Sequence, residues 1–289
     1  MSFRTVLITK HCKCSYKNGS LVVRGVETKL IHLSEIYCLV IESTAALITS
    51  YLINELMKQK IPIIFCDEQH NPCAQVLPFY GSHNTSKRVS LQAKWSEMHK
   101  KIVWTKIVHK KIQNQAALLK TLGCPDSALL AEYADNIELA DVSNREGHAA
   151  KVYFNSLFGK GFSRRDDSYL NAALDYGYSL ILSAFNREVV ANGYITQLGI
   201  CHRNEFNEFN LSCDLMEPFR PVIDKKVYSK HPFVFDEDMR YNLVDTLNSK
   251  VKLNGANYHL TTAIAIYTRN ILRCLSSGKL ENLALDLVI

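Results

Sequence analysis

The sequence lacks the long apolar runs that mark membrane-spanning helices and secretion signals. Its best candidate, residues 39–53, is interrupted by Glu42 and several hydroxyl side chains and falls short of the roughly 18 residues that a span needs. Near the N-terminus only residues 6–9 are apolar, too few for the core of a secretion signal. The sequence therefore predicts a cytoplasmic protein with no membrane partner.

Familiar nucleotide-binding and hydrolase motifs are also absent. The chain contains no GxxxxGK[ST] phosphate loop, no GxGxxG turn, no HExxH pair and no GxSxG nucleophile elbow. An active site must therefore be sought among residues that lie on separate segments of the chain.

The nine cysteines do not form the pattern of a disulfide framework, because their number is odd and no secretion signal precedes them. Two short groups contain candidate metal ligands. One is His11 with Cys12 and Cys14, and the other is the loop between Cys66 and Cys73. Neither group has a second pair at zinc-site spacing, so free thiols are the better interpretation.

The chain has 289 residues, 47% of them hydrophobic and 21% charged, which is typical of a packed globular protein. Residues 1–80 contain short segments rich in β-branched side chains, and Asn18-Gly19 is a strong hairpin signal. A helix that Ser43 or Thr44 would cap interrupts these strands. We predict a small β-rich domain over residues 1–80.

A polar stretch of small residues follows, and we assign residues 81–89 to a linker. Beyond it the hydrophobic pattern is helical, most clearly over 90–121, 144–158, 170–192 and 257–276. The predicted fold is α+β, with the β-rich domain followed by a larger all-α catalytic domain over residues 90–289.

Positive charge is concentrated in one part of the chain. Residues 81–124 contain nine lysine and arginine residues and one acid, Glu97, although the net charge of the whole chain is only +6. On a helix most of these lysines would project away from the apolar face. A solvated helix face is their ordinary role, but repulsion without neighbouring acids favours an anionic partner, and we expect nucleic acid.

The first candidate site residue lies where a helix is predicted to begin. Glu146 comes three residues after Ser143, which is the spacing of a capping box, and the helix dipole would also favour an acid there. Glu146 is thus a candidate functional carboxylate with an equally good structural explanation.

Two further segments carry ionisable residues. His202 precedes a polar stretch, 203–210, that we expect to form an ordered loop. Asp214 and Glu217 are three residues apart and would share a face on a helical turn, although Pro218 also allows Glu217 to be a capping residue. Together the three segments supply carboxylates and an imidazole, which suit Mg²⁺ or Mn²⁺, and a metal beside positive charge indicates phosphodiester chemistry.

Six short motifs add a family likeness to this reasoning: Leu33-Ser34-Glu35-Ile36, Ile64-Phe65-Cys66-Asp67, Asn144-Arg145-Glu146-Gly147-His148-Ala149-Ala150, Leu174-Asp175-Tyr176-Gly177-Tyr178, Gly199-x-x-His202 and Asp214-x-x-Glu217-Pro218-Phe219-Arg220. In order and spacing they resemble the spacer-acquisition integrases of CRISPR immunity, the first and near-universal family of CRISPR-associated proteins. The likeness covers nearly the whole chain and looks close to the type II-A branch.

The resemblance implies a fold and a metal site. Members of this family have an N-terminal β-rich domain that forms a homodimer and a helical domain that holds Mg²⁺ or Mn²⁺. The family's ligands fall on Glu146, His202 and Glu217 of this chain. Asp214 is implied either as a support for a ligand or as a ligand of a second metal.

The resemblance also implies an activity and partners. Members join a short double-stranded DNA fragment into the CRISPR repeat by attack of a 3′-hydroxyl on a phosphodiester, and they have metal-dependent DNA endonuclease activity. A small second adaptation protein bridges two dimers into a heterohexamer. In the type II-A setting the effector nuclease and a ring-shaped adaptation protein also take part, in the prokaryotic cytoplasm.

The basic residues of 81–124 are expected to form a ridge on a helix, and DNA contacts are expected from four of them: Lys87, Arg88, Lys100 and Lys101. Two arginines near the metal, Arg145 and Arg220, and one stacking ring, Tyr176, are expected to add further DNA contacts. For Tyr176, packing in the core is an equally good explanation. The alternative function is a non-catalytic DNA-binding scaffold of the adaptation complex, in which the acidic residues only cap helices.

Overall fold

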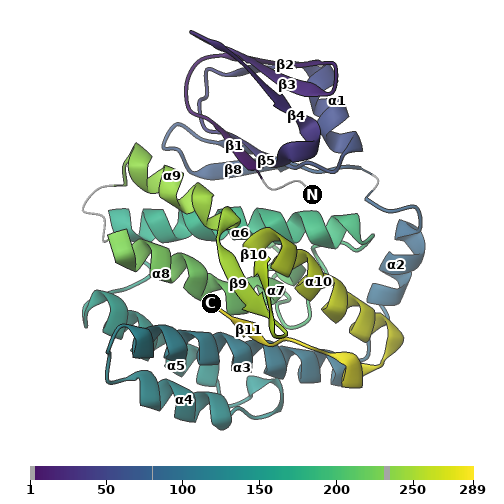
Figure 1. Ribbon diagram of the computed structural model, residues 1–289. Coiled ribbons are helices and arrows are strands. Elements are labelled where there is room, and N and C mark those ends of the chain that lie inside the picture. Colours follow the sequence, from purple (N-terminus) through teal and green to yellow (C-terminus); the bar gives the residue numbers. More distant parts are fainter. Residues whose placement is uncertain (1–3, 80, 231–234) are drawn as a thin grey trace.

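The computed structural model describes residues 4–79, 81–230 and 235–289. An N-terminal β-rich region stands above a mostly helical region, and the long helix α6 (Tyr169–Ala191) lies between them (Figure 1). Among all the residues that the structure describes, no helix combines the length and apolarity needed to cross a membrane.

A four-stranded sheet forms the base of the β-rich region. Its strand order is β1 (Arg4–Ile8), β5 (Ile36–Ile41), β7 (Ile63–Cys66) and β8 (Pro72–Val76), with only β8 antiparallel to its neighbour. Every residue of β5 is buried, because the helical region covers one face of the sheet and α1 (Ser50–Lys58) with a second sheet covers the other.

The second sheet contains the predicted hairpin. Its order is β4 (Thr28–His32), β3 (Ser20–Arg24), β2 (Lys13–Lys17) and β6 (Leu47–Ile48). Asn18 and Gly19 join β2 to β3 with φ of 47° and 79°, the two positive angles of a type I′ turn, so this prediction is confirmed. The predicted helix start at Ser43 or Thr44 is wrong. Residues 47 and 48 pair with β2, and Thr49 caps α1 instead.

Nine helices of the described residues follow the β-rich region: α2 (Thr85–Gln92), α3 (Glu97–Thr121), α4 (Ser127–Asp135), α5 (Arg145–Phe158), α6, α7 (Asn210–Met216), α8 (Arg220–Lys230), α9 (Glu237–Asp245) and α10 (Leu260–Ser277). The predicted segment 90–121 is therefore two helices, with a break at residues 93–96. Helix α2 also begins inside residues 81–89, the predicted linker, so only residues 81–84 of that segment are non-helical, and they form a bend and a turn.

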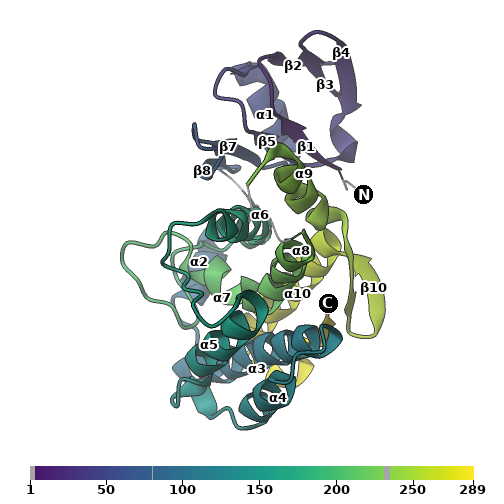
Figure 2. The same cartoon turned by 90° about the vertical axis from the view of Figure 1, so that its left-hand side faces the viewer.

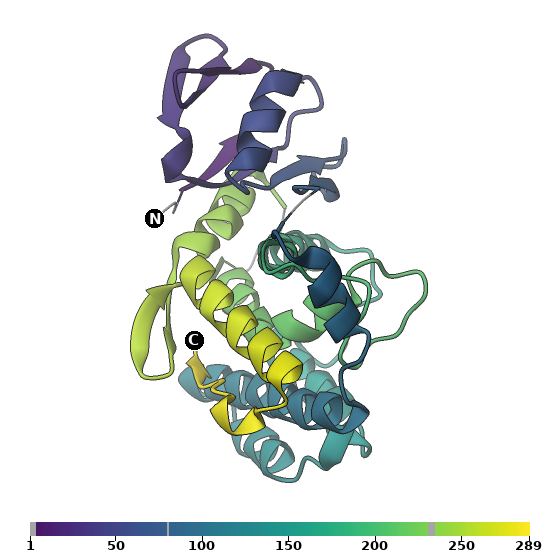
Figure 3. The same cartoon turned by 90° about the vertical axis from the view of Figure 1, so that its right-hand side faces the viewer.

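A three-stranded sheet interrupts this helical region and was not predicted, so the expectation of purely helical structure there needs correction. It comprises β10 (Ala256–His259), β9 (Lys250–Leu253) and β11 (Leu287–Val288), and the β9–β10 hairpin lies at the edge of the helical region (Figure 3). Asn254-Gly255 forms its turn with φ of 49° and 85°. The sequence signal is the same as in the first hairpin. It was missed because β9 and β10 have only four residues each.

The two regions are joined by a shared core and by buried polar contacts. Tyr37 and Val40 of β5 belong to the same hydrophobic cluster as the helices. Glu42, just after β5, is buried and forms an ion pair with Arg240 of α9. Seen from the side, α6 runs beneath β7 and β8 (Figure 2), where Gln75 donates a 2.6 Å hydrogen bond to the Ser183 hydroxyl. The sheet thus rests directly on the helices that position the candidate site.

Candidate metal centre

A buried lysine brings two of the predicted carboxylates together. Lys111 on α3 has its Nζ 2.6 Å from Oε1 of Glu146 and 2.5 Å from Oε2 of Glu217. Burial alone would lower the pKa of Lys111, but the negative charges of Glu217 and Glu146 outweigh it and raise that pKa above its usual value. The ammonium group therefore remains charged between two acids that are 71 residues apart in the chain.

Glu146 is free to reach Lys111 because other residues cap its helix. Asp141 accepts hydrogen bonds from the backbone N–H groups of Arg145 and Glu146, at 2.8 and 3.0 Å. Asn144, the residue before α5, accepts one from Gly147. The hydroxyl of Ser143 is buried with no hydrogen-bond partner in the described structure. The capping-box explanation of Glu146 is therefore wrong, and its side chain points into the site.

Glu217 begins a short 3₁₀ turn, η3 (Glu217–Phe219), that α3 holds in place. The Asn114 side chain donates a 2.9 Å hydrogen bond to the carbonyl of Pro218. Glu217 Oε1 accepts a 2.8 Å bond from Arg220 Nε. Burial alone would raise the pKa of Glu217, but Arg220 and Lys111 overcome this effect and lower the pKa to about 2. Glu217 is thus a buried carboxylate that stays ionised at neutral pH, and its side chain does not act as a helix cap.

His202 is held by Asp214, which is fully buried. One Asp214 oxygen lies against His202 Nδ1 and the backbone N–H of His202, and the other accepts bonds from the N–H groups of Ile200 and Cys201 at 2.6 and 2.9 Å. The hydrogen bond to Asp214 raises the pKa of His202, although partial burial opposes it. With both oxygens occupied, Asp214 supports the imidazole, and this favours the first of its two predicted roles.

The Asp214 contacts require the loop to pass very close to the carboxylate. A Cβ atom on Gly199 would lie only 2.8 Å from Asp214 Oδ2 and would also collide with the carbonyl of His202. Glycine at this position therefore allows the backbone N–H groups to surround the acid. The Gly199-x-x-His202 motif is explained by this close approach.

His202 lies along the same helix face as the carboxylate pair. Its ring meets the Trp104 ring edge-on at a centroid distance of 5.6 Å. Trp104 and Lys111 are seven residues apart on α3, so they share a face about 10 Å apart along the axis. As placed, with the ammonium between the two acids, no three His, Cys, Asp or Glu side chains of the described residues converge into a metal-binding group.

A second buried acid supports the arginine beside Glu217. Asp224 on α8 accepts hydrogen bonds from the hydroxyls of Tyr153, at 2.8 Å, and Tyr178. The guanidinium of Arg220 lies 4.6 Å from the centre of the Tyr178 ring. Burial raises the pKa of Asp224 to about 6, although the two tyrosine hydrogen bonds and the positive charge of Arg220 oppose this. A chain of contacts thus runs from Asp224 through Tyr178 and Arg220 to Glu217.

The predicted DNA-binding residues fall in different environments. Lys87 and Lys101 are exposed, Lys100 pairs with Glu97 at 2.5 Å, and Arg88 packs by Tyr194. The basic residues of 81–124 do not form one ridge, because they lie on two helices and Lys111 points inward.

The other three residues predicted to contact DNA, Arg145, Arg220 and Tyr176, pack against side chains of the protein itself. Arg145 lies over the ring of Tyr133 at 5.4 Å, and Arg220 pairs with Glu217 as described above. The prediction that Tyr176 stacks on DNA bases is wrong. Its ring is fully buried and packs edge-on against Phe235, which is the core alternative.

Lys111 is the site residue that the sequence reasoning missed. By its sequence position it falls among the basic residues expected to face nucleic acid, yet it follows Ile107 by four residues and directly precedes Ile112, both of which are fully buried. A lysine on the apolar face of an amphipathic helix is rarely buried without an ionic partner. That pattern is the signal that could have identified it.

Fold and site together define a class of protein: an α+β chain whose helical part collects two acids and an oriented histidine along one face of a central helix. A sequence profile of the family described as "CRISPR associated protein Cas1" matches residues 5–231. The "CRISPR-associated endonuclease Cas1" of Neisseria meningitidis serogroup C (strain 8013) is 34% identical over 271 residues, covering 91% of this chain and 89% of the relative. The chain therefore belongs to the Cas1 family.

Solved structures show the same fold at lower identity. A casposase bound to integration product is similar with a TM-score of 0.80 and 19% identity, covering 96% of this chain and 92% of that chain. A chain of a Cas6-RT-Cas1–Cas2 complex is similar with a TM-score of 0.73 and 17% identity, covering 98% of this chain and 36% of that chain. These likenesses agree with a β-rich N-terminal region followed by helices.

Proposed function

We propose that this protein is a metal-dependent DNA integrase and endonuclease of CRISPR adaptation. In this proposal a DNA 3′-hydroxyl attacks a phosphodiester of the CRISPR repeat; a new phosphodiester bond joins the fragment, and the old bond breaks to release the 3′-hydroxyl end of the cut repeat strand. The observation that carries the proposal is the pairing of Glu146 and Glu217 across Lys111, with a histidine that a buried aspartate orients on the same face of α3. The endonuclease name of the Neisseria relative and the integration product bound to the casposase support it.

The donor atoms fit Mg²⁺ or Mn²⁺. Glu146, Glu217 and His202 are the residues that would hold the ion, since two carboxylates and one imidazole match the preference of these metals. Glu217 Oε2 is buried and lacks a hydrogen-bond donor of good geometry, and a positive charge already lies between the acids. Bound there, the metal would supply Lewis-acid stabilisation of the charge that develops on the phosphate.

The protein's own residues have separate tasks around that ion. Asp214 fixes the His202 ring through Nδ1, which leaves Nε2 as the free ring nitrogen. Arg220 keeps Glu217 ionised and adds positive charge beside the phosphodiester. Lys111 neutralises the two acids until the metal binds, so the carboxylates can stay close together without unfavourable repulsion.

Partners follow from the same proposal. The substrates are double-stranded DNA, both the fragment and the repeat, and the basic residues of α2 and α3 neutralise its phosphates. A small second adaptation protein would bridge two homodimers of this chain, and one fold neighbour comes from a Cas1–Cas2 complex. The type II-A branch, its effector nuclease and its ring-shaped protein remain predictions from the sequence resemblance, and a cytoplasmic location remains a prediction from the sequence.

Strand joining by the E146Q variant tests the proposal. The assay follows the transfer of a fluorescent duplex into a supercoiled plasmid that contains the repeat, in Mn²⁺ and in EDTA. We expect wild-type joining only with metal, and a fall of more than about 100-fold in E146Q, since a lost ligand removes several kcal/mol of transition-state stabilisation. DNA binding by E146Q should stay within about threefold of wild type, because the basic residues are unchanged.

The matched control is E132Q, which makes the same change at an exposed acid of α4 and should join DNA at the wild-type rate. Joining by E146Q at the rate of E132Q would refute catalysis at this site and would favour the non-catalytic scaffold.

A further inference from the structure

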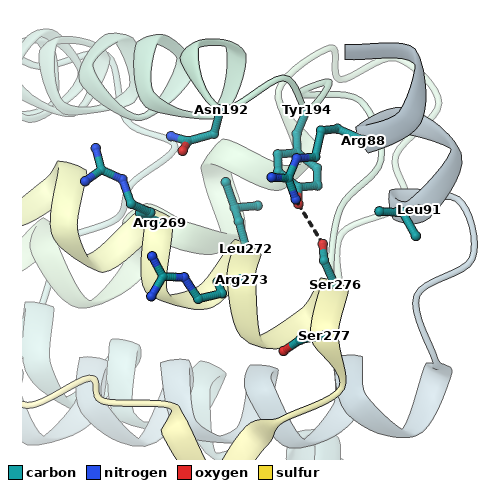
Figure 4. Close-up of a pocket in the computed structure, with 9 residues that line it drawn as sticks. All are labelled: Arg88, Leu91, Asn192, Tyr194, Arg269, Leu272, Arg273, Ser276 and Ser277. Carbon is teal, nitrogen blue, oxygen red and sulfur yellow. Dashed lines mark hydrogen bonds between the residues drawn. The ribbon is translucent and has the colours of Figure 1, made fainter. Parts of the chain in front are cut away.

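A second positively charged site lies between α2, the end of α6 and α10 (Figure 4), and it shares no residue with the carboxylate site. It is a pocket of about 300 Å³. Its polar lining comes chiefly from three arginines and three neutral side chains, namely Arg88, Arg269, Arg273, Asn192, Tyr194 and Ser277.

The three arginines come from opposite sides of the pocket. Arg269 and Arg273 are four residues apart, so they project from the same face of α10, whereas Arg88 reaches in from α2 (Figure 4). Arg88 is held in place, since Nη1 donates a 3.4 Å hydrogen bond to the Tyr194 hydroxyl, which in turn lies 2.6 Å from Ser276 Oγ. Arg269 and Arg273 are exposed and therefore available to a ligand.

No acid balances this charge. Within the described ranges none of the three arginines forms an ion pair with a carboxylate, and no acidic side chain lines the pocket. Glu188 interacts electrostatically with Arg269, but it is buried and already forms an ion pair with Arg187 at 2.5 Å. Three guanidinium groups around one concavity repel one another, and an anion would relieve that repulsion.

The chemistry of the lining indicates the kind of anion. Guanidinium groups bind phosphate oxygens through paired, charge-assisted hydrogen bonds, and they do so better than point charges. A tetrahedral phosphate presents oxygens to several sides and carries enough charge for more than one arginine. The Asn192 amide donates one hydrogen to the carbonyl of Glu188 at 2.7 Å, so its second hydrogen is left as a neutral donor.

We propose that this pocket binds a phosphate group outside the carboxylate site. The phosphate belongs either to the backbone of the DNA substrate, a source that rests on the proposed function, or to a free phosphate compound. In the first case the pocket anchors the DNA at a point away from the reacting bond, and it acts in binding without touching the reacting atoms.

The R269Q/R273Q variant, which removes the two exposed arginines, tests the inference. Its control is R24Q/R165Q, which removes two exposed arginines elsewhere, neither of them ion-paired in the described structure. The first arm adds inorganic pyrophosphate alone and follows the melting temperature in EDTA. The second arm measures the affinity for a duplex by fluorescence polarisation across a range of salt concentrations, also in EDTA.

We expect pyrophosphate to stabilise the wild type and R24Q/R165Q but not R269Q/R273Q. If the phosphate is a DNA phosphate, the slope of log affinity against log salt should also fall by about 1 to 2 more in R269Q/R273Q than in the control. If R269Q/R273Q lost the pyrophosphate response but kept the same salt slope as R24Q/R165Q, the pocket would be supported and its ligand would be a free phosphate compound.

Equal behaviour of the two double variants in both arms would overturn the inference. Failure of the proposed function is a separate result, because it would appear as no DNA binding or joining by the wild type, whereas the pyrophosphate arm needs neither.

Discussion

Replacing Lys111 by methionine tests the central feature of the site, because the side chain keeps much of its length and loses only its charge. In EDTA the change leaves Glu146 and Glu217 facing each other without the ammonium between them. Breaking a buried ion pair by removing one partner costs about 3–5 kcal/mol. Arg220 still pairs with Glu217, and the Glu146 side chain is 24% exposed, so we expect the lower end of that range.

A loss of about 3 kcal/mol corresponds to a fall of about 5 °C in the melting temperature of a chain of this size. Metal should reverse the effect. In K111M a divalent cation meets two carboxylates with no ammonium between them, whereas in the wild type it must first displace the ammonium. Mn²⁺ should therefore raise the melting temperature of K111M more than that of the wild type.

The assay is thermal unfolding of both proteins in EDTA and in increasing Mn²⁺, with K101M as the control. Lys101 lies on the same helix, is exposed and has no ion pair in the described structure, so K101M should match the wild type in both conditions. The role assigned to Lys111 would be wrong if K111M had the same melting temperature as K101M in EDTA, or if Mn²⁺ raised the melting temperatures of the two variants equally.

Two further variants probe the buried acids. D214N replaces one carboxylate oxygen by an amide NH₂ that faces backbone N–H donors. We therefore expect the free energy of unfolding in urea to fall by about 2–3 kcal/mol and strand joining to be reduced. An unchanged urea midpoint would contradict the role of Asp214 in holding His202. D224N tests pH dependence. Burial raises the pKa of Asp224 from 3.8 to about 6, so its contribution to stability is fully present below pH 3.8 and is lost as the pH rises through 6. Between pH 7 and pH 4 the wild type should gain about 2.4 kcal/mol relative to D224N, and parallel profiles of the two proteins would show that the acid is not held in this way.

Local signals predicted the parts of the fold that depend on neighbouring residues. Asn18-Gly19 marked its hairpin because both residues accept positive φ, and the same pair at Asn254-Gly255 marked a second hairpin that was overlooked between helical patterns. The start of α1 was misplaced because a two-residue strand pairing across the chain, at residues 47–48, takes precedence over a good local cap.

The site was predictable in its residue types and less so in its contacts. Acids and a histidine stood out in three segments, the family resemblance assigned Glu146, His202 and Glu217 as the ligands, and the structure places these three along one face of α3. Sequence could not decide between capping and function for Glu146, because the side chains that cap α5, Asn144 and Asp141, are not at the capping-box spacing from it. The use of Asp214 likewise depends on backbone groups 12 to 14 residues away.

The continuous packing between the sheet and α6 bears on how this chain can be dissected. A fragment cut at Gly81 would expose the Tyr37 and Val40 face of β5 to water in one half and would leave Arg240 without Glu42 in the other. Neither half would then keep the hydrophobic and ionic partners that it has in the intact molecule. Truncation is thus a poor way to assign activities to the two regions, and point variants of the full 289 residues are the sound route.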